Sequence, residues 1–205
     1  MKNKIFYIIM FTLILGVVAY TGYHAYNEFF KKETVEEPKE KVKLDSLELY
    51  GYTLTEDATE TYKEYFNELK EVLNAETVDE KEYASSVTKL FITDFYTLAN
   101  KISSSDFGGL EFIHDDLKEN FKINAGDTIY NHVKTNLDGK REQKLPEVSK
   151  VEISNVEENE YNYNNKTYEG YKVTATWTYK EDLGYESEGT FYLIKEENKL
   201  YIVQK

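Results

Sequence analysis

The sequence predicts an α+β fold: an N-terminal transmembrane helix, then about three helices packed on a curved four-stranded antiparallel sheet. Three observations favour it. The chain begins with an uncharged apolar stretch as long as a membrane span, its middle part repeats apolar residues at helical spacing, and its last third alternates apolar and polar residues. Because the helical patterns come first and the strand patterns follow, the class is α+β rather than α/β.

Composition limits the class of protein. The chain has 205 residues, of which 40% are hydrophobic and 31% charged, so its size and apolar content suit one domain with a packed core. The net charge is −13, and the first 32 residues carry more lysine than acid, so the whole excess of negative charge lies beyond them. We expect no nucleic-acid partner, because an acidic surface repels the phosphate backbone. The absence of cysteine excludes disulfides, thiolate nucleophiles and thiolate metal sites.

The N-terminal segment predicts a membrane anchor. No charged residue occurs from Ile5 to Tyr23, and a helix of this length spans about 28 Å, close to the ~30 Å hydrocarbon core of a bilayer. Lys2 and Lys4 precede the span and favour a cytoplasmic N-terminus. A cleaved signal peptide is the alternative, but its best cleavage site, ending at Ala25, has a bulky tyrosine at the first small position. We therefore expect contact with membrane lipid through Ile5 to Tyr23.

Three segments follow from these patterns. Residues 1–26 are predicted to be the transmembrane anchor. Residues 27–46, which are charged and lack periodicity, are predicted to be a stalk. Residues 47–205 are predicted to form an α+β domain that lies outside the cytoplasm, because the lysines before the span set its orientation in the cell membrane.

Apolar stripes predict the helices of this domain. A first helix is predicted over residues 56–74 and a second over residues 78–102, the latter introduced by Thr77 as N-cap with Glu80 three residues later. A third is predicted over residues 127–139, between a capping aspartate and a glycine that stops the helix. The residues of the third helix expected to face the core are Ile129, Val133 and Leu137.

The stretch SSSDFGGLEFIHDD, residues 103–116, has the composition of an active site. Its His114, Asp115 and Asp116 are adjacent, however, and adjacent residues point to different sides of a helix, whereas metal ligands need i, i+4 spacing or a ligand loop. The glycines suit a helix end that needs positive φ, and the carboxylates suit the start of a short helical turn. We interpret the stretch as a bend.

Period-two alternation predicts four strands after Pro146. The clearest is YKVTATWTYK, in which the aromatic and apolar residues from Tyr171 to Tyr179 take one face. The others are a strand around residues 151–154, ESEGTFYLIK and LYIVQK. The polar EENEYNYNNKT between the first two strands is interpreted as a hairpin loop. The short connections favour an antiparallel meander.

This order of elements resembles the nuclear-transport-factor-two-like superfamily, the cone-shaped fold shared with the SnoaL-like enzymes. The resemblance covers residues 55–205 and rests on the helical stripes and on three closing strands, YKVTATWTYK, EGTFYLIKE and KLYIVQK. With the anchor in front, the chain looks like the bitopic assembly factors of type IV secretion and conjugation systems. That likeness implies a scaffold that self-associates or binds other envelope proteins. An anchored protein of a Gram-positive-type cell fits the same pattern.

Few residues are candidates for a site. No catalytic motif, phosphate-binding loop or metal-ligand pattern occurs, so no catalytic, cofactor-binding or metal-binding residue is assigned and no cofactor is expected. Enzymes of the resembled fold use the interior of the cone, and Asp94, Tyr62 and Trp177 are expected to line it. A buried aspartate has a raised pKa and can act as a base. Alternatively, Asp94 lies at the edge of its helix and pairs with a lysine or a tyrosine hydroxyl.

The sequence therefore leaves two functions open. The first is a non-enzymatic, single-pass membrane-anchored protein that acts as a protein-interaction or scaffold module of a bacterial cell-envelope complex. The alternative is a small-ligand-binding protein or hydrolase that uses the interior of the cone.

Overall fold

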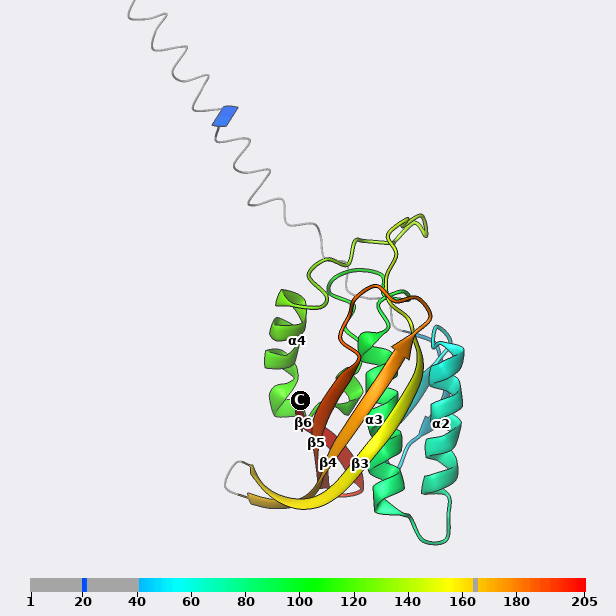
Figure 1. The fold of residues 1–205 in the computed structure, drawn as a ribbon, viewed down its shortest axis with the longest axis vertical. Coiled ribbons are helices and arrows are strands. Elements are labelled where there is room, and N and C mark those ends of the chain that lie inside the picture. The colour runs from blue at the N-terminus through cyan, green and yellow to red at the C-terminus, as the bar shows by residue number, and fades with distance from the viewer. Residues whose placement is uncertain (1–19, 22–40, 164–165) are drawn as a thin grey trace, which may run out of the picture. The chain divides into compact units, whose positions relative to one another are not determined.

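A computed structural model describes residues 20–21, 41–163 and 166–205 of the chain. Residues from Glu40 to Lys205 form one compact unit (Figure 1). Within the described residues, no helix is both long enough and apolar enough to cross a membrane. Apart from Tyr20 and Thr21, the predicted span from Ile5 to Tyr23 lies outside the described residues.

The predicted α+β class is confirmed for this unit. Its α-helices are α2 (Glu60–Leu73), α3 (Glu80–Tyr96) and α4 (Lys118–Asp127). Its main sheet contains β3 (Val148–Tyr163), β4 (Lys166–Tyr179), β5 (Glu188–Glu196) and β6 (Lys199–Gln204). The four strands are antiparallel and lie in the order β3-β4-β5-β6, which is the predicted meander (Figure 1).

A short hairpin precedes the helices. Strands β1 (Lys43–Leu47) and β2 (Tyr52–Thr55) pair antiparallel, and the turn between them uses Gly51 at φ 69°, a conformation that glycine adopts without steric cost. The folded unit therefore includes residues 41–46, which the sequence pattern had assigned to the stalk. Strand β1 (KLDSL) does not alternate between apolar and polar residues, and β2 (YTLT) is only four residues long, so the sequence pattern does not distinguish the hairpin.

Helix α2 starts at a Thr59 N-cap, whose side chain accepts a hydrogen bond from the Tyr62 amide. Helix α3 starts at an Asp79 N-cap rather than at the predicted Thr77. It also ends at Tyr96, six residues earlier than predicted. The reason is a tertiary contact: the amides of Leu98 and Ala99 donate to the carbonyl oxygen of Pro146, at 2.9 and 3.1 Å.

The predicted third helix over residues 127–139 is wrong. Helix α4 ends at Asp127, and the segment that follows consists of turns and irregular backbone. Tyr130 is drawn into the core, where its hydroxyl donates to the Phe95 carbonyl at 2.8 Å and accepts the Gly108 amide at 2.9 Å. These contacts bend the chain away from a helical path. Leu137, predicted to face inward, is 65% exposed, whereas Val133 is buried as predicted.

Side-chain hydrogen bonds to the backbone connect the segment 128–137, at Lys134, to residues 99–101. Arg141, the single arginine of the chain, donates to the carbonyl oxygens of Lys101 and Ala99, each at 2.8 Å, and to that of Lys134 at 3.0 Å. The threonine, asparagine and histidine residues in this segment are poor helix formers, so tertiary contacts decide its path.

Strands β3 and β4 are longer than the alternation indicated. The polar stretch EENEYNYNNKT, predicted to be a loop, continues the pairing from Glu157↔Lys172 to Tyr163↔Lys166. Strand β5 pairs with β4 only from Gly170 to Thr176, so the far end of β3–β4 extends beyond the four-stranded sheet as a two-stranded ribbon. We call residues 157–163 and 166–169, which are this ribbon and the end of β3 that leads into it, the distal ribbon.

Aromatic side chains fill the space between α3 and the sheet. Trp177 on β4 lies against Tyr96 of α3, with ring centroids 4.5 Å apart, and against Phe191 of β5 at 6.2 Å. Phe91 of α3 lies 5.7 Å from the same Phe191 ring. All four side chains are at most 2% exposed. This part of the sheet is a packed core rather than an open cone.

Candidate functional site

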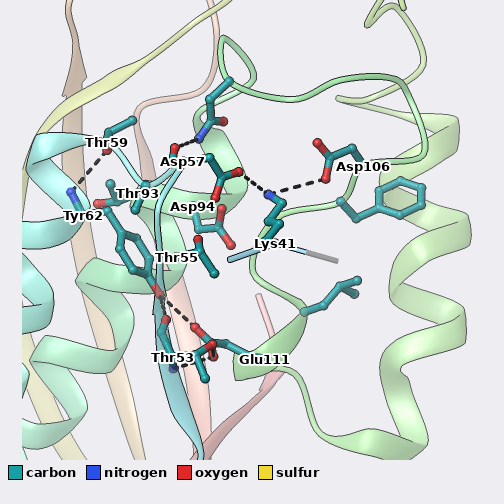
Figure 2. A pocket seen from close by; sticks show the side chains of 14 residues that line it. Lys41, Thr53, Thr55, Asp57, Thr59, Tyr62, Thr93, Asp94, Asp106 and Glu111 are labelled. Carbon is teal, nitrogen blue, oxygen red and sulfur yellow. Dashed lines mark hydrogen bonds and ion pairs between the residues drawn. The ribbon is translucent and has the colours of Figure 1, made fainter. Parts of the chain in front are cut away.

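Two of the three residues selected from the sequence, Asp94 and Tyr62, line one pocket (Figure 2). The pocket has a volume of about 190 Å³ and lies between β2, the start of α2, α3 and the segment 100–111. We call it the Asp94 pocket. Trp177, the third, is in the aromatic core described above and not in this pocket. The Asp94 pocket therefore brings together two of the three residues and leaves out Trp177.

Asp94 is held in a buried ion pair. Its Oδ1 lies 2.6 Å from the Nζ atom of Lys101, whose side chain is fully buried, and its Oδ2 accepts the Gly109 amide at 2.6 Å. Asp94 itself keeps 28% of its side-chain surface. This is the predicted alternative in which Asp94 pairs with a lysine.

The electrostatics of Asp94 do not suit a general base. Burial raises the pKa of Asp94, but the charge and hydrogen bond of Lys101 and the hydrogen bond from Gly109 outweigh that effect, so the net pKa lies below its ordinary value. The lowered pKa fits the alternative in which Asp94 pairs with a lysine and does not fit a general base. A carboxylate stabilised in its ionised form and already hydrogen-bonded through both oxygens is a weak proton acceptor.

Glu111 is the second carboxylate of the pocket. One oxygen accepts the Tyr62 hydroxyl at 2.8 Å, and the other accepts the amide and the hydroxyl of Thr53, each at 3.0 Å (Figure 2). Burial raises the pKa of Glu111, although these hydrogen bonds oppose the shift. The sequence analysis did not select Glu111, because it lies in a bend where no periodicity indicates which side chains turn inward.

Lys41 enters the pocket from the segment before β1 (Figure 2). Its Nζ lies 2.8 Å from Asp57 and 3.7 Å from the buried Asp106. Burial lowers the pKa of Lys41, but the charges of Asp106 and Asp57 raise it more, and the net pKa is above its ordinary value. Lys41 thus connects the start of the folded unit to the segment just before α2 and to the segment that follows α3.

These contacts form an ionic network that links the segments around the Asp94 pocket. Asp57, Asp94, Asp106 and Glu111 each have a partner within the protein. In the part of the chain that the structure describes, no group of three or more histidine, cysteine, aspartate or glutamate side chains could hold a metal ion.

The stretch SSSDFGGLEFIHDD forms the bend that its sequence indicates. Gly109 has φ 76° and precedes a 3-10 turn, Leu110–Phe112. A second turn, Asp115–Leu117, leads into α4. His114 lies away from the Asp94 pocket, with its Nε2 atom 3.2 Å from Glu196.

The chain matches no protein-family model, no curated protein and no solved structure. The likeness to the nuclear-transport-factor-two-like superfamily thus stays a prediction from the order of elements.

Proposed function

We propose that the chain is a single-pass membrane protein with a cytoplasmic N-terminus, and that its α+β unit is a non-enzymatic protein-interaction module of a bacterial cell-envelope complex. The observation that carries the non-enzymatic part is the Asp94 pair. Asp94, the best candidate base, stays ionised because the positive charge of Lys101 balances its carboxylate. The other acids of the pocket also have partners within the protein. The anchor is supported by the uncharged span from Ile5 to Tyr23.

The order of helices followed by an antiparallel meander supports a fold of the nuclear-transport-factor-two-like kind. We extend the proposal to a scaffold role like that of the bitopic assembly factors of type IV secretion and conjugation systems. In such a role the α+β unit binds neighbouring proteins or further copies of itself outside the cytoplasm.

The distal ribbon is the surface best suited to a partner. From Glu160 onward it projects past the last β4–β5 pair, and β3 is one of the two edge strands of the four-stranded sheet. Its exposed side chains include Glu157, Glu158 and Glu160, so the edge discourages pairing between two copies of itself and favours a basic partner.

Site-specific cross-linking in intact cells tests the interaction role. A photoreactive benzoylphenylalanine at the exposed Asn159 of the distal ribbon should give an adduct with an envelope protein. The same group at the exposed Glu71 on α2 is the matched control and should give less of that adduct. A module that forms no adduct at either position and remains monomeric would refute the scaffold role.

The alternative is a ligand-binding protein or hydrolase that uses the interior of the cone, and the space around Trp177 does not favour it. The aromatic cluster around Trp177 occupies the interior that this alternative needs. An Asp94→Asn variant that loses a cellular phenotype while keeping its fold and its cross-linked partner would restore this alternative.

A further inference from the structure

A groove separates α4 from the rest of the folded unit. It has a volume of about 930 Å³ and lies between α4, the second half of α3, the segment 183–186 and the end of β6. In Figure 1, α4 stands apart from β6 on the side opposite α2. We call this space the α4 groove.

The walls of the α4 groove are mainly apolar. The side chains that form them include Phe91, Phe95, Ile113, Phe121, Ile129 and Ile202. Helix α4 packs inward through Phe121, whose ring lies 5.1 Å from that of Phe95, and through the buried Ala125. On the outer side of the same helix, Ile123 is 60% exposed and does not line the groove.

The rim of the α4 groove carries uncharged polar groups. Asn120, Asn124 and Thr128 are spaced four residues apart along α4 and its end, so they follow one side of the helix, and Gln204 of β6 also lines the groove. Two charged side chains, Glu186 and Lys205, also line the groove, and they form an ion pair with each other.

We propose that the α4 groove binds a neutral single-chain amphiphile, with the hydrocarbon chain against the phenylalanine rings and an uncharged, hydroxyl-bearing head at the asparagine row. The volume is in the range of small-molecule sites, about 300–1,000 Å³, and such sites combine apolar walls with a few polar groups. Asparagine and threonine side chains donate and accept hydrogen bonds, as hydroxyl groups do.

The charges of the protein favour a ligand with an uncharged head group. The chain carries a net charge of −13, which disfavours an anionic ligand. A cationic head would compete with Lys205 for Glu186, and an anionic head would compete with Glu186 for Lys205. This inference goes beyond the proposed function and does not depend on it, since the groove lies entirely within the folded unit.

Photolabelling of the full chain in membrane vesicles tests the proposal. The probe is a decyl glucoside with a diazirine at the end of its alkyl chain. We expect saturable labelling of residues 113–129 or 202–205, mapped by mass spectrometry, and stronger competition by unlabelled decyl glucoside than by decanoate. Labelling confined to residues 5–23, or equal competition by decanoate, would overturn the proposal.

Three variants of α4 complete the test. Phe121→Glu places a carboxylate among the apolar walls and should reduce labelling at least about tenfold, because burying an unpaired charge is unfavourable by more than 1.4 kcal/mol. Ile123→Glu adds the same charge on the exposed side and should leave labelling unchanged. Asn124→Phe fills the groove from an exposed position and should reduce labelling even if Phe121→Glu fails to fold. Undiminished labelling of a folded Asn124→Phe variant would also overturn the proposal.

Discussion

Replacing Lys101 by methionine tests the ionic network of the Asp94 pocket. The substitution keeps an unbranched apolar stem in a fully buried position but removes the ammonium group 2.6 Å from Asp94. Breaking a buried ion pair by removing one partner is unfavourable by about 3–5 kcal/mol. Because Asp94 keeps 28% of its side-chain surface and the Gly109 amide, we expect a loss of stability at or just below the lower end of that range, about 2–3 kcal/mol at pH 7.

The effect of Lys101→Met should depend on pH. The folded-state pKa of Asp94 is lowered, so the pair stabilises the protein above the unfolded pKa of about 3.9, and this stabilisation is lost as the pH falls through the lower folded value. Without Lys101, the desolvated carboxyl is easier to protonate in the folded state. The difference in unfolding free energy between wild type and Lys101→Met should therefore shrink as the pH falls from 7 to below 4.

Urea denaturation of residues 40–205, followed by the fluorescence of Trp177, measures these differences. The double variant Lys101→Met/Asp94→Asn provides the control for coupling. It should lose less stability than the sum of the two single variants, by about 1–3 kcal/mol. A loss below about 0.5 kcal/mol for Lys101→Met, within the range of surface substitutions and with no pH dependence, would show that Asp94 is not held by Lys101.

Three further variants probe the fold around this pocket, each by urea denaturation. Tyr130→Phe leaves a buried amide and a buried carbonyl without their partner and should lose about 1–3 kcal/mol, whereas Tyr185→Phe, whose hydroxyl has no hydrogen bond among the described residues, should change stability little. Gly108→Ala places a Cβ atom 2.2 Å from a backbone oxygen and should lose about 3 kcal/mol or more. Gly139→Ala, at φ 70° in open space, should lose only about 1–2 kcal/mol, and equal losses for the two glycines would refute the close contact at Gly108. The raised pKa of Glu111 means that its ionisation destabilises the fold, so Glu111→Gln should gain stability relative to wild type as the pH rises from 4 to 7, and a constant difference would refute that.

The helices and strands could be predicted where the residue pattern alone decides them. The alternation of YKVTATWTYK predicts β4 and its buried face, and the apolar stripe of residues 60–73 predicts α2. Long-range contacts decide the rest. Helix α3 stops at Tyr96 because Pro146, fifty residues further along, accepts the next free amides. No local pattern in the sequence predicts such a contact.

The environment of Asp94 could be predicted only in part. Its place near Tyr62 follows from two helical stripes that face the same side of the fold. Its pairing with Lys101 does not, because on the predicted helix the two residues are nearly two turns apart, about 10 Å along the axis. The early end of α3 lets the chain turn back and bring Lys101 to the carboxylate.

The distal ribbon is a case in which neighbouring residues pair as strands although their sequence predicts a loop. Glutamate and asparagine are rare in strands, so the polar stretch 157–167 looks like a loop. In the structure, cross-strand pairs such as Glu157 with Lys172, whose charged atoms lie 3.5 Å apart, accompany the pairing of the two strands. Propensity therefore underestimates strands whose partner lies next to them in the chain.

Membrane topology is the most direct test of the proposed role. The chain contains no cysteine, so a single introduced thiol can be followed without background. We expect Glu71→Cys, on the exposed side of α2, to react with a membrane-impermeant maleimide in intact cells, and Lys4→Cys to react only after the cells are lysed. A Glu71→Cys thiol that stays protected until lysis would place the folded unit in the cytoplasm and contradict the proposed envelope function.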